Sequence, residues 1–115
     1  NIVVMHHPVY STAKNRDNTI LRERFRPIFE KYGVDLVLQG HDHTYARGTA
    51  GQVRPVYLLS VAGPKMYGSD SERWMEVSGA QTQLYQVIRV TDEKLYFSSY
   101  KLNGQLFDSF ELSKK

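Results

Sequence analysis

The residues of this chain best suited to chemistry are its histidines, which all lie in two short clusters at residues 6–7 and 41–43. Neutral imidazole is a good ligand for zinc, iron and manganese. Two histidines separated by one residue, with a third supplied by another segment, form a common arrangement of metal ligands. The pattern therefore indicates a transition-metal site built from His6, His41 and His43, in preference to four structural histidines.

The elements that must position these histidines are two short strands and one helix. Residues 2–5 and 34–38 are β-branched runs typical of buried strands. Between them, apolar side chains recur at helical spacing from Leu21 to Tyr32, and Gly33 is a suitable C-terminal cap. A strand–helix–strand unit of this length has parallel strands, so both clusters should fall at the same sheet edge, within about 10 Å of each other.

Local backbone geometry refines this expectation. In an extended segment, residues i and i+2 point the same way, so His41 and His43 should share a face while Asp42 points off it. The same alternation turns His7 away from His6. We expect His7 to be a surface residue or a substrate contact, and Asp42 to be a structural or solvated carboxylate.

The rest of the chain is predicted to be mostly β. An apolar strand is expected at 55–61, followed by a long loop over 63–80 that contains Trp74. Three strand-like runs follow, and Asn103-Gly104 before the last is a strong hairpin signal, so we expect an antiparallel meander. The runs cover residues 83–91, 94–102 and 105–112.

Composition narrows the function classes. The chain has 115 residues, a net charge of +3 and no cysteine, which fits one domain and excludes disulfides and cysteine-based zinc sites. No apolar run approaches the roughly 18 residues of a membrane span. The modest charge favours a solvated surface over a nucleic-acid interface. We therefore expect neither a membrane nor a nucleic acid as a partner.

The first residues, Asn1 to Met5, lie inside an apolar run and do not start with methionine. This suggests a piece of a longer protein. If so, strands 2–5 and 34–38 would lose part of their cover, and the exposed sheet would favour self-association.

Two sequence blocks resemble a known family. The stretch from Val3 to Pro8 resembles the VxxH block of calcineurin-like metallophosphoesterases, and Gly40 to His43 resembles their GHxH block. The flanking sequence at residues 33–47 is most similar to that of the purple acid phosphatase branch. The resemblance implies a β-sandwich flanked by helices, of mixed α/β (α+β) class, with metal ions at the strand ends. Residues 1–115 would be the C-terminal portion of that catalytic domain, a βαβ unit followed by a meander.

The resemblance also implies a ligand set. His6 and His41 would bind one ion and His43 the other, the two ions being iron, zinc or manganese. Together they would activate a water that hydrolyses phosphate esters. The carboxylate-bearing and Asn-His blocks of the family lie upstream of VxxH, so this chain alone is expected to hold at most one weakly bound ion and to be inactive. The resemblance favours a secreted or periplasmic parent protein.

Substrate contacts are less constrained. Plant-type relatives carry histidines in the loop after VxxH, where this chain has Arg16, which could clamp a phosphate or simply lie on the surface. His7 is a second candidate for phosphate binding. The loop side chains of Lys65, Met66, Tyr67 and Trp74 could line the rim of the site. Tyr45 and Arg47 are expected to be structural.

Two alternatives remain open. One is a complete mononuclear three-histidine zinc hydrolase. The other is a non-catalytic interaction module with structural histidines. A metallo-β-lactamase-like site is excluded, because Tyr45 and Ala46 stand where its HxHxDH motif needs aspartate and histidine.

Overall fold

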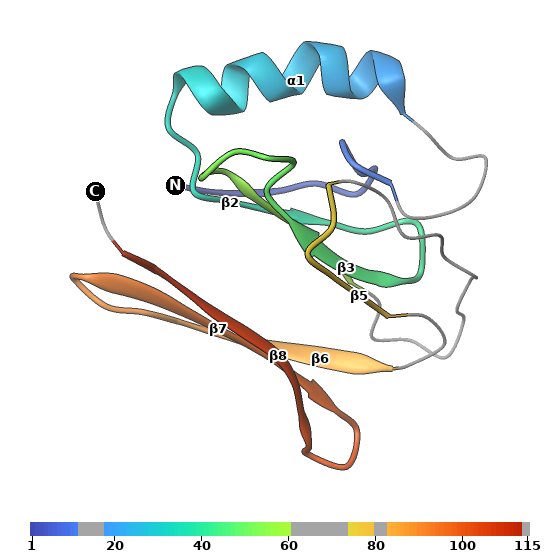
Figure 1. The fold of residues 1–115 in the computed structure, drawn as a ribbon, viewed down its shortest axis with the longest axis vertical. Helices are drawn as coiled ribbons and strands as arrows, with labels where there is room; N and C mark the ends of the chain where they lie inside the picture. The colour runs from blue at the N-terminus through green and yellow to red at the C-terminus, as the bar shows by residue number, and fades with distance from the viewer. Residues whose placement is uncertain (12–17, 61–73, 80–82, 114–115) are drawn as a thin grey trace.

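The computed structural model describes residues 1–11, 18–60, 74–79 and 83–113, which form three layers (Figure 1). Helix α1 (Thr19–Lys31) covers one face of a five-stranded central sheet, and a three-stranded sheet covers the other. The central sheet has the order β1 (Ile2–Val4), β2 (Leu36–Gln39), β4 (Val56–Leu59), β3 (Tyr45–Gly48), β5 (Val77–Gly79). The second sheet is the meander β6 (Leu84–Val90), β7 (Lys94–Lys101), β8 (Leu106–Ser113).

The strand–helix–strand unit forms as predicted. Strands β1 and β2 are direct parallel neighbours, with Val3 opposite Val37, so no strand separates the two histidine clusters. Helix α1 buries Phe29 against the sheet and ends at Lys31. Gly33, two residues later, has a φ of 63°, which suits a glycine after a helix. This helix, the only one in the described part of the chain, has 13 residues and is not long and apolar enough to cross a bilayer.

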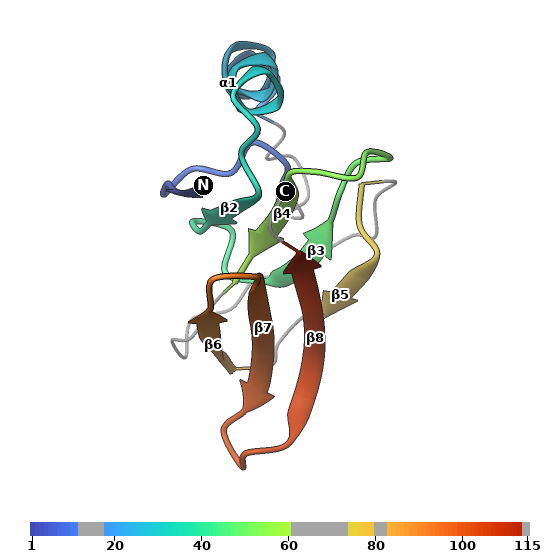
Figure 2. The ribbon, with the colours of Figure 1, turned by 90° about the vertical axis from the view of Figure 1, so that its left-hand side faces the viewer.

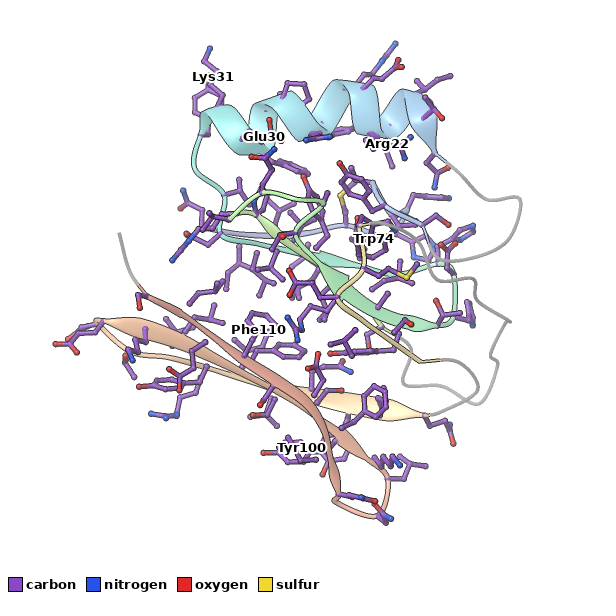
Figure 3. The ribbon with its side chains drawn as sticks, viewed as in Figure 1. Arg22, Glu30, Lys31, Trp74, Tyr100 and Phe110 are labelled. Carbon is purple, nitrogen blue, oxygen red and sulfur yellow. The ribbon has the colours of Figure 1, made fainter. Side chains whose placement is uncertain are left out.

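The core on the helix side of the central sheet is aromatic. Tyr10 packs edge-on against Tyr57 at a centroid distance of 4.6 Å, and Trp74 lies 5.6 Å from Tyr10. Phe29 from α1 and Val37 from β2 close this cluster. Figure 3 shows Trp74 between the helix and the central sheet. The predicted place of Trp74 at a substrate rim is therefore wrong, because its indole is buried and donates to the carbonyl of Ser11 at 3.1 Å.

On the face of the central sheet opposite α1, a second core forms where the meander packs against β2, β4 and β3. Figure 2 shows the meander below the central sheet, with α1 end-on above it. Alternate residues of β7 and β8 point inward, so that Phe97 stacks on Phe110 at 4.7 Å, while Tyr100 projects from the outer side (Figure 3). The predicted antiparallel meander is confirmed, and Gly104 in its last turn has a φ of 87°.

Two strand predictions need correction. Strands β3 and β5 were not expected, and β5 falls within the predicted loop at 63–80. They pair antiparallel, and Gly48 at the end of β3 lets the backbone at Trp74 approach so closely that a Cβ would lie 1.6 Å from the Trp74 carbonyl oxygen. Such short, glycine-containing strands carry little periodic signal.

The prediction that residues 2–5 form a fully buried strand is also wrong. Ile2 and Val4 are 43% and 76% exposed. They share a face with Leu36 and Leu38, which contact the meander-side core, but β1 is the edge strand and lies beyond the part of the sheet that the meander covers.

Candidate metal centre

His6 and His41 meet because the backbone continues to pair after β1 and β2 end. The amide of Met5 donates to the Leu38 carbonyl and the amide of Gly40 donates to the His6 carbonyl, both at 2.9 Å. These bonds hold the two turns side by side at the carboxyl edge of adjacent parallel strands. Ligand sites in α/β proteins occur at this edge.

The two imidazoles are within ligand distance of a common ion. Nε2 of His6 lies 3.2 Å from Nδ1 of His41. Two nitrogens bound tetrahedrally to one zinc at its usual bond length lie about 3.3 Å apart. Without an ion, the same spacing suits a hydrogen bond from one ring to the other. The donor atoms of these residues therefore fit a transition-metal ion.

His7 joins the pair, contrary to the expected alternation. Its ring centroid lies 4.4 Å from that of His41 and 4.9 Å from that of His6. One nitrogen of each of these three histidines falls within 4.8 Å of the other two, and among the described residues no carboxylate belongs to this group. Alternation fails because β1 already ends at Val4, so residues 5–7 do not follow a strand.

His43 does not join this group in the part of the chain that the structure describes. The backbone explains why. His41 and His43 have φ values of 73° and 52°, both left-handed, so the segment is not extended and the two-residue alternation of a strand does not apply to it. Left-handed backbone at a residue other than glycine costs about 1–2 kcal/mol, and such conformations cluster at functional sites.

Asp42 between these histidines is fully buried and anchors the turn. Its carboxylate accepts a hydrogen bond from the Ser11 hydroxyl at 2.5 Å. Gln39 fixes the same loop, because its Oε1 accepts from the amides of Val9 at 2.6 Å and Tyr10 at 3.3 Å. The segment after His7 is thus tied to the segment around His41 through buried polar contacts. Asp42 is structural, as one of the two expected readings had it.

The other predicted site residues divide into two groups, and one further residue was not predicted. Arg16, Lys65, Met66 and Tyr67 lie outside the described residues. Tyr45 and Arg47 are structural, as expected: the Tyr45 hydroxyl donates to Asp108 at 2.7 Å, and Arg47 donates to the same carboxylate at 2.8 and 3.1 Å. The structural role of Gln39 was not predicted. The one sequence feature that could have indicated it is a polar residue at the end of an apolar run, directly before Gly40.

Comparison with known proteins adds independent information. Residues 1–45 match the family model described as calcineurin-like phosphoesterase. Purple acid phosphatase 17 of Arabidopsis thaliana is 36% identical over 69 residues, an alignment that covers 60% of this chain and 20% of that protein. The matched segment is therefore a small part of that relative.

Solved structures share the fold. The chain aligns over 99% of its length with 36% of a Plasmodium protein described as GAP50, the anchor in the inner membrane complex, with a TM-score of 0.85 and 18% identity. It aligns over 97% of its length with 24% of the purple acid phosphatase PPD1 from yellow lupin seeds, with a TM-score of 0.78 and 16% identity. At these identities the likeness establishes the fold.

Proposed function

Because this chain belongs to the calcineurin-like metallophosphoesterase superfamily, in its purple acid phosphatase-like branch, we propose that it supplies histidine ligands to the dinuclear metal centre of a phosphatase. The reaction is hydrolysis of a phosphate ester by an activated water. The observation that carries the proposal is the 3.2 Å approach of His6 Nε2 to His41 Nδ1 at the carboxyl edge of β1 and β2.

In this proposal each histidine has a separate role. His6 and His41 hold one ion, and His43, two residues after His41, serves the second. Metal ions bound there would supply Lewis-acid polarisation of the phosphoryl oxygen and a water of lowered pKa. Asp42 and Gln39 contact no substrate; they hold the two turns in register. His7 and Arg16 remain candidates for phosphate binding.

The chain by itself should be inactive. Neutral imidazoles carry no negative charge, and no carboxylate belongs to the histidine group among the described residues, so two dications close together would repel each other uncompensated. The chain alone should therefore hold one ion at most, and the activity would belong to a longer protein.

A paired assay tests this proposal. The chain and a longer version of the protein are incubated with zinc, manganese or iron and p-nitrophenyl phosphate. Only the longer version should turn over, and His41→Ala in it should lower kcat/KM by several orders of magnitude. Absence of metal-dependent turnover in every longer version, with metal bound, would contradict the proposal.

A second candidate function is favoured by one observation. His6, His7 and His41 form a three-nitrogen group within 4.8 Å, which suits a mononuclear zinc hydrolase complete in this chain. Zinc titration of His7→Ala and His41→Ala separates the two candidates. The mononuclear site requires His7→Ala to weaken zinc binding as strongly as His41→Ala does, with turnover by the chain alone. The dinuclear centre requires His7→Ala to leave zinc affinity nearly unchanged.

A further inference from the structure

A cavity of about 600 Å³ opens beside the histidine group, between it and the first turns of α1. His7 belongs both to the cavity wall and to the histidine group, since its ring lies 4.4 Å from that of His41. A molecule held at the histidines can therefore extend directly into the cavity. This volume is in the range of small-molecule sites.

The lining of the cavity is partly apolar and partly positively charged. Ile20, Leu21 and Phe25 provide an apolar wall on one side of α1. Arg24 adds a cation to this wall, and it forms no ion pair with any residue in the described part of the chain. Ile20 is 72% exposed, so a large aliphatic side chain stands uncovered beside the candidate centre.

The exposed positions of Ile20 and Arg24 are not needed to dock α1 on the central sheet. The helix docks through Phe29, which is buried, and through Leu21, which packs against the helix-side core. Ile20 and Arg24 are one helical turn apart and face outward. Ile20, an exposed apolar side chain, is followed one turn later by the guanidinium of Arg24, which has no ion pair among the described residues. This pair suits a ligand that is apolar near the reacting end and anionic further away.

We propose that this cavity binds the organic group of the substrate, and that the preferred substrate class is an aryl phosphate monoester with a second negative charge on the ring. The proposal rests on the proposed phosphatase function. The phosphate lies at the histidines, the ring packs against Ile20 and Phe25, and the second anionic group meets Arg24.

Binding of three ligands to the zinc-loaded chain tests the proposal without requiring turnover. Isothermal titration calorimetry compares inorganic phosphate, phenyl phosphate and 4-carboxyphenyl phosphate at one ionic strength. Phenyl phosphate should bind about fivefold tighter than phosphate. An apolar group in an enclosed pocket raises affinity by about tenfold or more, and this pocket is open, so the ring should gain only part of that factor. The added carboxylate should gain about another twofold to fivefold, and that gain should shrink with salt.

Two variants separate the contributions, and a third is the control. Ile20→Ala should remove most of the advantage of phenyl phosphate over phosphate. Arg24→Ala should remove only the advantage of the carboxylate. Ile28→Ala, at a position on α1 that is 48% exposed and not part of the cavity lining, should change neither. All three positions are exposed, so circular dichroism should confirm that each variant folds.

The outcomes distinguish the inference from the function on which it rests. If inorganic phosphate binds but the ring and the carboxylate add nothing, the inference fails and the metal centre stands. If Ile28→Ala has the same effect as Ile20→Ala, the preference does not come from the cavity, and the inference fails again. If none of the three ligands binds to the zinc-loaded chain, the inference fails, whereas the proposed function is decided separately by turnover in a longer version of the protein.

Discussion

The buried tyrosine hydroxyls on the two faces of the central sheet differ in whether they have a hydrogen-bond partner. On the meander side, the Tyr45 hydroxyl and the Arg47 guanidinium both donate to the buried Asp108 carboxylate. On the helix side, the hydroxyls of Tyr10 and Tyr57 are buried without a hydrogen-bond partner in the described structure. Left-handed backbone at His41 and His43 lies at the edge of that same sheet.

The difference suggests that the polar contacts on the meander side mainly stabilise the fold, whereas the helix side and the adjoining sheet edge keep features that serve a site. A satisfied polar network gives a unique, rigid packing. Unsatisfied hydroxyls and left-handed histidines lower stability, and native proteins tolerate such features chiefly where function requires them. The meander should therefore be more sensitive to loss of a polar partner, whereas some changes on the histidine side should stabilise the fold while impairing metal binding.

The largest effect should follow removal of the carboxylate at the centre of the meander network. Asp108→Ala leaves the half-buried Arg47 and the buried Tyr45 hydroxyl without this acceptor. Breaking a buried pair costs about 3–5 kcal/mol, and because Arg47 keeps Glu76 as a partner the loss should fall at the lower end, about 3 kcal/mol. Urea denaturation measures the loss. Lys94→Ala is the matched control, because Lys94 pairs with Glu111 on the exposed side and should change stability by less than about 1 kcal/mol. Equal effects of the two variants would remove the contrast between network and surface.

Alkaline pH should weaken the same network. Burial, and then the hydrogen bond to Asp108, raise the pKa of Tyr45 above its ordinary value of 10. Because the folded pKa is the raised one, the stabilisation is complete below pH 10 and is lost as pH rises from 10 towards the folded value. The slope is about 1.4 kcal/mol per pH unit for this group. Tyr45→Phe should show a shallower decline of stability between pH 10 and 11 than the unchanged chain. An identical decline in both would contradict this origin.

Much of this architecture follows from sequence patterns with a strong period. The βαβ unit and the meander were predictable because the helical stripe from Leu21 to Tyr32 and the Asn103-Gly104 turn are local signals. The convergence of His6 and His41 followed from strand parallelism alone. Strands β3 and β5 could not be predicted, because they are held by long-range pairing and by the close approach of Trp74 to Gly48.

The fine geometry of the centre could not be predicted for a related reason. Whether His7 or His43 joins His6 depends on where β1 ends and on the sign of φ at His41 and His43. No residue pattern encodes either. The turn conformation is set by buried contacts between distant segments, such as Ser11 with Asp42, so three-dimensional packing decides which histidines meet.

The strain at the centre should be measurable as a gain in stability. His43→Gly removes the Cβ from a residue with a φ of 52°, and should stabilise the metal-free chain by up to about 1 kcal/mol, less any contact that the imidazole makes. Ala50→Gly, at a φ of 53° in a turn away from the histidines, is the control for the backbone effect alone. Only His43→Gly should lower the amount of metal that a longer, dinuclear protein binds, measured by elemental analysis.

Gly104→Ala makes the opposite change in the meander turn. There φ is 87° and an added Cβ would meet no atom within 4 Å, so the loss of about 1 kcal/mol would come from conformation alone. A stability loss in both His43→Gly and Ala50→Gly would mean that left-handed backbone carries no strain at this edge of the sheet.

The smallest effect distinguishes the two buried tyrosines. Tyr57 is 1% exposed and its hydroxyl has no hydrogen-bond partner among the described residues, so Tyr57→Phe removes a buried polar atom without removing a hydrogen bond seen there. Stability should stay equal or rise by up to about 1 kcal/mol, whereas Tyr45→Phe, which loses its bond to Asp108, should cost about 1–2 kcal/mol. Both substitutions preserve the ring and its packing, so urea midpoints at constant denaturant slope compare the hydroxyls directly. A loss at Tyr57 as large as that at Tyr45 would mean that the helix-side hydroxyl has a partner in solution, and that the two faces of the sheet are equally well satisfied.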